Sequence, residues 1–559
     1  MESAPPLSLD ARLGPRGVDL VAGLLVPGAL GGSGRTELRT THASWVFLRG
    51  DDVWKVKRPV AFGFLDFKTV EARRRFCEEE VRLNGRLAPE IYLGVEPVRR
   101  SGHGFVVGKR GPAGGEDVVD WAVHMRRLPD AASAAARLAR SALGADDLAI
   151  LAERLAAFHR AARVTPDFGA AARLRANVDE NFAETERLIG GLLDQRLVGG
   201  LLDRDSFEET RAFQSGWLDA HEALVRLRQR EGRIREGHGD LRLEHVYFLP
   251  EAAPSRSPVV IDCVEFDERF RCGDVAGDVG FLAMELEAVR RPDLGAGFLA
   301  RYAEASDDFG LYAVLDFYLS YRAWIRGKVA ALVARDAATS ADLRRAKRDE
   351  ARRDFALARS YARRAADPAF VVAVGGMIGS GKSTLASALG RALAAPVVSS
   401  DRTRKALAGL EPTARAGAEL YTDVHRDRTY GEVLGRSGVV AASGRGVVLD
   451  ATFAEGRWRA AAAAGARSLG ATFVLIEVTC ADETTLRTRL AHRRGAAFAS
   501  DATDAELDGF RRRYAAPDDS EGIPLLHVDG GGTEARALGA ALDGLRRFGV
   551  LPAAERSQS

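Results

Sequence analysis

The sequence has little cysteine, no long hydrophobic run and no excess of one charge. Its four cysteines are scattered without a CxxC pair, so neither a zinc site nor a disulfide framework is predicted. No apolar stretch reaches the ~18 residues of a membrane helix, and the first residues lack the pattern of a signal peptide, so we expect a cytoplasmic protein. With 80 basic and 78 acidic residues, the net charge gives no general reason to expect a nucleic-acid or membrane partner.

The length and composition predict a globular protein with more than one domain. A chain of 559 residues, 46% hydrophobic and 28% charged, is too long for a single core. A helical stretch dense in interleaved acids and bases ends near Pro368, and such a stretch is typical of a solvated connector rather than an RNA-binding arm. We predict a weakly ordered lead-in over 1–35, a first domain over 36–335, a helical connector over 336–366, a second domain over 367–553 and a tail over 554–559.

The first domain begins with a pattern typical of a β-hairpin followed by a helix. Two runs of alternating hydrophobicity within residues 43–60 flank Gly50-Asp51-Asp52, which predicts a turn at these three residues. Helical apolar spacing follows over residues 68–88 and stops before Pro89. A hairpin followed by a helix is the order found in the N-terminal lobe of kinases.

The strongest motif lies in the second domain, where the apolar strand AFVVAVG runs into a glycine-rich loop and then a helix. The residues from Gly376 to Ser383 match the Walker A pattern GxxxxGK[ST] at every fixed position. In such a P-loop, backbone N–H groups surround the phosphates of ATP, Lys382 reaches the β and γ oxygens, and Ser383 can hold Mg²⁺. Later strands alternate with helical stretches, which predicts a parallel sheet wrapped by helices. The predicted nucleotide-binding residues are Gly376, Gly379, Ser380, Gly381, Lys382, Ser383 and Thr384.

Charged residues follow the later strands of the second domain. Asp401 and Arg404 lie one helical turn apart, so an acid that deprotonates a hydroxyl and an arginine that binds an anionic acceptor would share a face. The alternative is an N-cap aspartate with a solvated arginine. Asp450 ends the next strand, where a carboxylate can hold the metal ion. Arg489 and Arg493 share a helical face and could close over the triphosphate, with a solvated basic face as the alternative.

These residues give the second domain a resemblance to a known family. Residues from about 370 to 550 resemble the P-loop kinases that phosphorylate small molecules or polynucleotide 5′ ends, through the Walker A motif, the DxxR after the second strand and the arginine-bearing lid. The resemblance implies that Asp401 is the general base and that Arg404 binds the acceptor. It does not select a subgroup.

A second and unrelated kinase pattern lies in the first domain. The loop HGDLRLEH, residues 238–245, and the later segment VVIDCVEF resemble the aminoglycoside phosphotransferase and choline kinase group. This resemblance covers residues from about 35 to 330. It implies that Asp240 is the catalytic base, that Asp262 binds the metal ion and that Asp278 braces the catalytic loop.

The same resemblance implies a phosphate-binding lysine paired with a helix acid. Glu80 matches the acid, and the lysine lies in the strand VWKVK. Because side chains alternate along a strand, Lys55 and Lys57 share one face, so the sequence does not choose between them.

Two features depart from the pattern of that group. His245 stands where the group has a metal-binding asparagine, and the segment TTHAS before the hairpin lacks the usual phosphate-covering glycines. A neutral imidazole can bind a divalent metal, although it suits zinc or manganese better than magnesium. The sequence therefore leaves two alternatives for this domain, an active phosphotransferase that could use Mn²⁺ and a pseudokinase or sensor.

The combination of the two patterns resembles a bacterial group described as bifunctional aminoglycoside phosphotransferase/ATP-binding proteins. The expected fold classes are α+β for the kinase-like first domain and α/β for the P-loop domain. We predict an ATP-dependent kinase that phosphorylates a hydroxyl of a small polar metabolite, with the C-terminal site the better supported catalyst. The alternatives are a regulatory first domain that controls the P-loop domain, and a polynucleotide 5′-hydroxyl kinase, which the near-neutral charge disfavours.

Overall fold

The computed structural model describes residues 15–552 apart from short internal segments, and the chain divides into two compact units. The first unit comprises residues 1–147, 158–174 and 221–282, and the second comprises residues 148–157, 175–220 and 283–559. This division differs from the predicted one, because helices assigned to the first domain belong with the P-loop domain. The internal segments outside the description are residues 33, 42, 63–64, 102–103, 109–117, 191–200, 250–257, 337–338, 365–368, 412 and 493–506.

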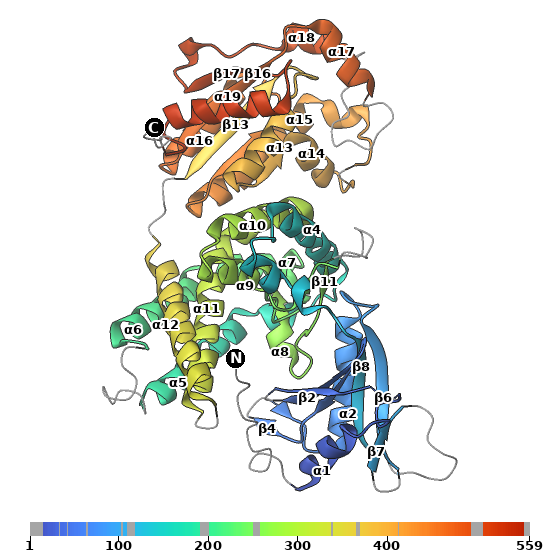
Figure 1. Cartoon of the computed structure of the whole chain (residues 1–559). Coiled ribbons are helices and arrows are strands. Elements are labelled where there is room, and N and C mark those ends of the chain that lie inside the picture. The colour runs from blue at the N-terminus through green and yellow to red at the C-terminus, as the bar shows by residue number, and fades with distance from the viewer. Residues whose placement is uncertain are drawn as a thin grey trace, which may run out of the picture. The chain divides into compact units, whose positions relative to one another are not determined.

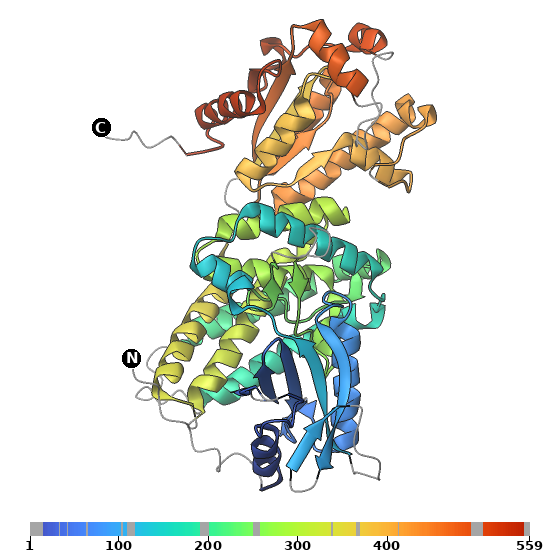
Figure 2. The same cartoon turned by 45° about the vertical axis from the view of Figure 1, so that its right-hand side comes forward.

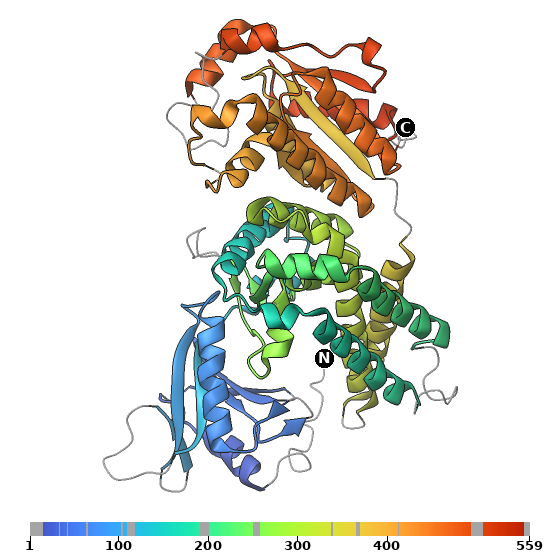
Figure 3. The same cartoon turned by 180° about the vertical axis from the view of Figure 1, so that it is seen from behind.

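The first unit begins with a six-stranded antiparallel sheet in the order β1-β2-β3-β8-β6-β7. Strands β2 and β3 form the predicted hairpin, with Gly50 at a φ of 56° in the turn between them. Helix α2 (Val70–Asn84) lies along one face of the sheet (Figure 1; Figure 3) and confirms the predicted helix. The strands are β1 (Glu37–Thr40), β2 (Ser44–Arg49), β3 (Asp52–Lys57), β6 (Tyr92–Ser101), β7 (Gly104–Val107) and β8 (Val118–Arg126).

Helix α1 (Pro15–Leu24) covers the opposite face of this sheet (Figure 2). Leu20, Val21 and Leu24 are buried in one cluster with Trp45 and Trp54 of the sheet. The prediction of a weakly ordered lead-in over residues 1–35 is therefore wrong from residue 15 onward, because one turn of α1 presents an apolar stripe that the sheet buries.

The remaining elements of the first unit carry the predicted catalytic loop. Two short antiparallel ladders, β9 with β12 and β10 with β11, hold the loop between them. A further two-stranded ladder, β4 with β5, follows the hairpin. The elements are β4 (Ala61–Phe62), β5 (Leu65–Asp66), α3 (Ala134–Ala139), α7 (Glu222–Arg230), β9 (Ile234–Glu236), β10 (Val246–Tyr247), β11 (Val259–Val260), α8 (Glu268–Arg271) and β12 (Cys272–Asp274); α4 (Ala145–Ala161), α5 (Ala171–Gly190) and α9 (Val275–Ala288) span both units.

The helical part of the second unit contains α6 (Arg204–Ala220), α10 (Pro292–Ser306), α11 (Leu311–Arg335) and α12 (Ala341–Arg363). Helix α12 falls in the predicted solvated connector, yet it lies against α11 and buries Phe355 and Tyr361 (Figure 1). Buried Ser320 of α11 receives a hydrogen bond from Gln214 and donates one to the Ala358 carbonyl of α12. The connector prediction missed this packing because most charges of α12 occupy its outer face, although Asp354 is buried with Phe355 and Tyr361.

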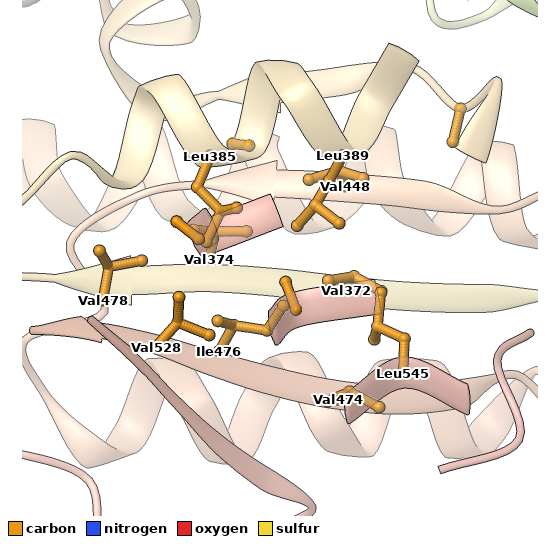
Figure 4. Packing of buried hydrophobic residues seen from close by; sticks show 14 residues of the cluster. Val372, Val374, Leu385, Leu389, Val448, Val474, Ile476, Val478, Val528 and Leu545 are labelled. Carbon is orange, nitrogen blue, oxygen red and sulfur yellow. The ribbon is translucent and has the colours of Figure 1, made fainter. Parts of the chain in front are cut away.

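The P-loop part of the second unit is a five-stranded parallel sheet in the order β14-β15-β13-β16-β17, as predicted. Figure 4 shows Val372 and Val374 of β13 between Leu385 of α13 and Ile476 of β16 in the core. The elements are β13 (Phe370–Gly376), α13 (Lys382–Leu393), β14 (Val397–Ser399), α14 (Ser400–Leu407), α15 (Asp423–Ala442), β15 (Val447–Asp450), α16 (Gly456–Ser468), β16 (Thr472–Thr479), α17 (Glu483–His492), α18 (Leu507–Arg513), β17 (Leu525–Asp529) and α19 (Glu534–Arg547).

Polar contacts join the helical and P-loop parts within the second unit. Glu304 of α10 accepts the backbone N–H of Val397 at 2.8 Å, and Arg436 of α15 donates to both carboxylate oxygens of Asp307. These contacts explain why the two parts form one compact unit. Within the described residues, no helix is both long and apolar enough to cross a membrane.

Candidate active sites

The P-loop has the backbone that its glycines predict. Gly376, Gly379 and Gly381 have φ values of 138°, 81° and 100°, which side chains rarely allow. A Cβ at Gly376 would lie 2.4 Å from the Val478 carbonyl oxygen. Lys382 begins α13, so the loop ends at a helix N-terminus, where the unpaired N–H groups favour an anion.

Ser383 and Asp450 lie together beside the P-loop. Strands β13 and β15 are neighbours with Val374 opposite Asp450, and the Ser383 hydroxyl donates to the Asp450 carboxylate at 3.1 Å. Burial raises the pKa of Asp450, and the nearby Asp401 carboxylate raises it further against the effect of Lys382. Two hard oxygen donors in this arrangement fit a Mg²⁺ ion, which would neutralise charge on the β and γ oxygens of ATP.

Asp401 and Arg404 lie on the same turn of α14, next to this carboxylate. Ser399 is the N-cap of α14, so Asp401 is not the cap that the alternative required. Arg404 donates to Asp401 at 2.5 Å, lies 4.5 Å from the Tyr421 ring centroid and is only 11% exposed, so it is not a solvated arginine. The expected acid and arginine are therefore brought together at the carboxyl edge of the sheet.

The loop after Asp450 forms a wall of this site that sequence reasoning missed. Phe453 has a φ of 45°, which is strained for a residue with a bulky side chain. Its N–H donates to the Tyr430 hydroxyl at 2.9 Å, and its carbonyl accepts from Arg459 at 2.7 Å. Tyr430 in turn stacks on Trp458, with ring centroids 4.8 Å apart. Nothing in the local sequence signals this strain, which depends on partners far along the chain.

A cavity of about 330 Å³ lies on the other side of the P-loop. The turn between β17 and α19 lines it with Gly530 and Thr533, opposite Thr384 of α13. Its place beside the P-loop makes it a candidate pocket for part of a nucleotide. The signal that sequence reasoning overlooked is the glycine run DGGGT after the last strand. Arg489 also lines the cavity and donates to the Ser380 carbonyl at 3.3 Å, whereas the predicted Arg493 lies outside the described residues.

The first unit has its own set of converging charges. Lys55 of β3 contacts the Glu80 carboxylate of α2 at 2.9 Å and the Asp262 carboxylate at 2.8 Å. Although burial opposes the effect, Asp262 and Glu80 raise the pKa of Lys55, and Lys55 holds the pKa of Asp262 well below its usual range. Lys57 also contacts Glu80, but its side chain is fully buried. The structure thus places Lys55, and not Lys57, beside Asp262, the predicted metal ligand.

Asp278 braces the catalytic loop as the resemblance implied. Its carboxylate accepts the backbone N–H groups of His238 and Gly239 at 2.6 and 2.8 Å, and the His159 ring lies 3.1 Å away. Despite burial, the hydrogen bond from His159 holds the pKa of Asp278 well below its usual range. Gly239 has a φ of 84°, and the turn leaves Asp240 partly exposed at the end of the loop.

His245 occupies the position between Asp240 and Asp262. Its Nδ1 lies 2.9 Å from the Asp240 carbonyl oxygen, an acceptor only, so Nδ1 carries the proton. In a neutral imidazole the lone pair then lies on Nε2, which is 3.6 Å from the Asp262 carboxylate and 3.7 Å from that of Glu244. Nitrogen and carboxylate oxygen at this separation fit a divalent metal ion that tolerates imidazole.

Asn84, the last residue of α2, and Arg86, just beyond the helix, were missed by sequence reasoning and tie this end of α2 to both predicted catalytic segments. Asn84 accepts the backbone N–H of Cys263, next to Asp262, at 2.9 Å. Arg86 donates to the carbonyls of Glu236 and Gly237, just before the catalytic loop, at 2.8 and 3.0 Å. Their polar side chains at the end of a helix give no signal of these distant partners.

A protein-family profile and several sequence relatives match this chain. A family profile described as AAA domain matches residues 371–517. The uncharacterized protein Rv2004c of Mycobacterium tuberculosis is 31% identical over 440 residues, which cover 76% of this chain and 80% of that protein. The uncharacterized protein Mb2027c of Mycobacterium bovis matches with the same values.

Two solved structures are each similar to part of the chain. A gluconokinase from Sinorhizobium meliloti is 24% identical and covers 32% of this chain and 93% of its own, with a TM-score of 0.24. A putative aminoglycoside phosphotransferase from Ralstonia eutropha is 13% identical and covers 63% of this chain and 99% of its own, with a TM-score of 0.34.

The sites and the comparisons agree on the class of protein. The P-loop lies beside two carboxylates, an arrangement typical of ATP-dependent kinases, and Lys55, Glu80 and Asp262 converge as the resemblance implied. The long alignment with the mycobacterial relatives runs over most of both chains. The chain therefore belongs to the same family as the mycobacterial protein Rv2004c, with a C-terminal part that matches the AAA domain profile.

Proposed function

We propose that this protein transfers the γ-phosphoryl group of ATP to a hydroxyl of a small polar metabolite, and that the C-terminal site carries this reaction. The observation that carries the proposal is the placement of Asp401 and Arg404 beside the Ser383–Asp450 pair at the P-loop. An acceptor, a base and a phosphate cradle then meet at one edge of the sheet.

Each residue has a defined part in this transfer. Asp401 accepts the proton of the acceptor hydroxyl while the new P–O bond forms and the bond to the ADP oxygen breaks. Arg404 binds an anionic group of the acceptor and orients Asp401, which it contacts in the structure. Lys382 and Arg489 stabilise the charge that develops on the phosphoryl oxygens. Mg²⁺, held through Ser383 and Asp450, is the proposed metal ion.

The charges around Tyr430 and Trp458, the aromatic pair beside this site, favour a small acceptor over a polynucleotide. Tyr430 and Trp458 stack against each other, and Arg457 lies 4.6 Å from the Trp458 ring centroid. Arg457 is itself paired with Asp427 and Glu455, so this arginine adds no net positive charge for a phosphate backbone. We therefore place polynucleotide 5′ phosphorylation second.

The first unit is proposed as a second phosphotransferase site. Asp240 acts as its base, Lys55 binds phosphate, and Asp262 with His245 holds the metal ion, for which Mn²⁺ suits the imidazole best. The observation behind this proposal is that Lys55, Glu80, Asp262 and the braced loop are all in place, which a pseudokinase does not require. A cytoplasmic location follows from the use of ATP in both sites.

The test is ATP consumption by the full-length chain against a panel of sugars, aminoglycosides, nucleosides and a short 5′-hydroxyl oligonucleotide. Lys382→Ala silences the C-terminal site and Asp240→Ala silences the N-terminal site, so the two variants assign each activity. We expect the main activity to fall ~10²-fold or more in Lys382→Ala. Turnover that persists in Lys382→Ala and is lost in Asp240→Ala would move the main activity to the first unit. Binding of ATP without turnover of any acceptor would contradict the proposal, and turnover of the oligonucleotide alone would support the second candidate.

A further inference from the structure

Five charged side chains form an unbroken chain in the first unit. Lys55 bridges Asp262 and Glu80, and Lys57 bridges Glu80 and Glu265. Glu80 is thus shared by two lysines, with contacts of 2.9 and 2.7 Å. The two ends of the chain, Asp262 and Glu265, lie three residues apart on the same loop.

Lys57 is placed where it cannot touch a nucleotide. Its side chain is fully buried, and its ammonium group lies 5.0 Å from the centroid of the Phe67 ring. Its partner Glu265 is only 10% exposed. The only carboxylates that the described residues bring to Lys57 are those of Glu80 and Glu265. A phosphate-binding role therefore falls to Lys55 alone.

The loop that carries Asp262 is held in an unusual backbone conformation. Asp262 has a φ of 63°, a value that non-glycine residues keep only when their surroundings fix them. The N–H of Cys263 is held by Asn84 and that of Val264 by the His238 carbonyl. Among the described residues, the backbone of Glu265 makes no hydrogen bond to α2 or β3. Arg271 donates to its carbonyl at 3.3 Å, and its side chain reaches β3 through Lys57.

We propose that Lys57 and Glu265 are a positioning pair that fixes the metal-binding loop of the N-terminal site, so that the Asp262 carboxylate faces the metal ion and Lys55. The proposal rests on the proposed phosphotransferase function of this site. The ion pair with Lys57 holds Glu265 close to β3, while Lys55 contacts the Asp262 carboxylate directly.

The placement of charge in a dry interior supports a positional role. Removing two charged groups from water is costly, and apolar residues of similar size usually give equal or greater stability. An ion pair adds what apolar packing lacks, a defined distance and direction between two backbone segments. Here the pair joins the strand that carries Lys55 to the loop that carries Asp262.

The test compares nucleotide affinity with and without a metal ion. ADP binding to the full-length Lys382→Ala protein is measured by calorimetry with Mn²⁺ and with chelator, and the signal lost in Lys55→Met identifies the N-terminal site. The variants are Lys57→Met and Glu265→Gln. Glu268→Gln is the matched control, because it removes an equal charge three residues further on from an exposed side chain.

We expect Lys57→Met to lower the gain in ADP affinity that Mn²⁺ provides by at least tenfold, with less than a twofold change in metal-free affinity. Glu265→Gln should act in the same direction and decides the matter if Lys57→Met does not fold, since it leaves the Lys57–Glu80 contact intact. Lys55→Met should weaken ADP binding under both conditions, and Glu268→Gln should change neither.

Two results would overturn the proposal. If Lys57→Met weakens metal-free binding as Lys55→Met does, then Lys57 contacts phosphate directly. If Lys57→Met and Glu265→Gln lower only the melting temperature and leave the Mn²⁺ gain unchanged, then the pair merely stabilises the fold. Failure of the proposed function is separable, because it would appear as absent turnover by the Lys382→Ala protein while these binding differences persist.

Discussion

The imidazole of His245 predicts a metal preference that a single substitution should reverse. In His245→Asn, the side-chain amide can donate to the Asp240 carbonyl, as Nδ1 of the histidine does at 2.9 Å, and turn an oxygen toward the metal ion. The change replaces a nitrogen ligand with an oxygen ligand, which Mg²⁺ prefers and Mn²⁺ accepts equally well.

The two side chains are close enough to bind one metal ion. Neighbouring ligands of an octahedral ion at ~2.1 Å lie about 3.0 Å apart. Nε2 of His245 and the Asp262 carboxylate are 3.6 Å apart, so binding a metal ion requires them to approach by roughly 0.6 Å, which side-chain rotation allows. We expect Mn²⁺ to exceed Mg²⁺ as activator of the wild-type N-terminal site. A tenfold fall in that ratio on substitution corresponds to about 1.4 kcal/mol.

The assay measures turnover at saturating Mn²⁺ or Mg²⁺. It compares the full-length Lys382→Ala protein with the same protein that also carries His245→Asn. His124→Asn serves as control, because His124 pairs with Asp52 and Glu96 on the sheet, away from the loop. An unchanged manganese-to-magnesium ratio in His245→Asn would refute the ligand role. Absence of activity with either ion in the Lys382→Ala protein that retains His245 would favour the sensor alternative.

Three further substitutions test the fold around the sites. Gly530→Ala should weaken nucleotide binding about tenfold (~1.4 kcal/mol) in equilibrium titrations, because its Cβ would lie 2.1 Å from the Ser380 carbonyl oxygen, whereas Gly539→Ala meets nothing within 4 Å and should be neutral. Asn84→Ala should lower the free energy of unfolding by about 1–3 kcal/mol in denaturant titrations, because the Cys263 N–H loses its partner. Burial raises the pKa of Asp354 to about 6. Between pH ~4 and 6 the folded protein therefore binds more protons than the unfolded chain, so the free energy of unfolding should fall by up to about 3 kcal/mol as pH rises through this window. Asp354→Asn should flatten that slope in melting curves, and an unchanged slope would assign it to another group.

Sequence patterns were sufficient where the chemistry is local. The P-loop is one short segment, and its glycine angles follow from the motif, as does the parallel sheet that carries it. The loops of Asp240 and Asp262 likewise predict their roles, and the structure places both carboxylates beside His245. Asp401 and Arg404 were predicted as a pair and lie on one turn of α14.

The features that the sequence did not predict depend on contacts between segments far apart in the chain. Lys55 and Lys57 share a strand face, and only the depth of each side chain, 17% against 0% exposed, separates them. The strain at Phe453 and the wall formed by Tyr430 require partners that no spacing reveals. The many charged residues of α12 predict a solvated helix, because the apolar face that packs against α11 is narrow and contributes few residues to the pattern.

Helix α1 determines how this protein can be shortened. A truncation that begins at residue 36, where the sequence placed the first domain, would remove the cover from Trp45, Phe47 and Trp54. These side chains would present a continuous apolar surface on an open sheet, and such surfaces promote self-association. Poor solubility of a form shortened in this way would therefore report the loss of α1 and say nothing about either kinase site, whereas removal of residues 1–14 leaves the cover in place.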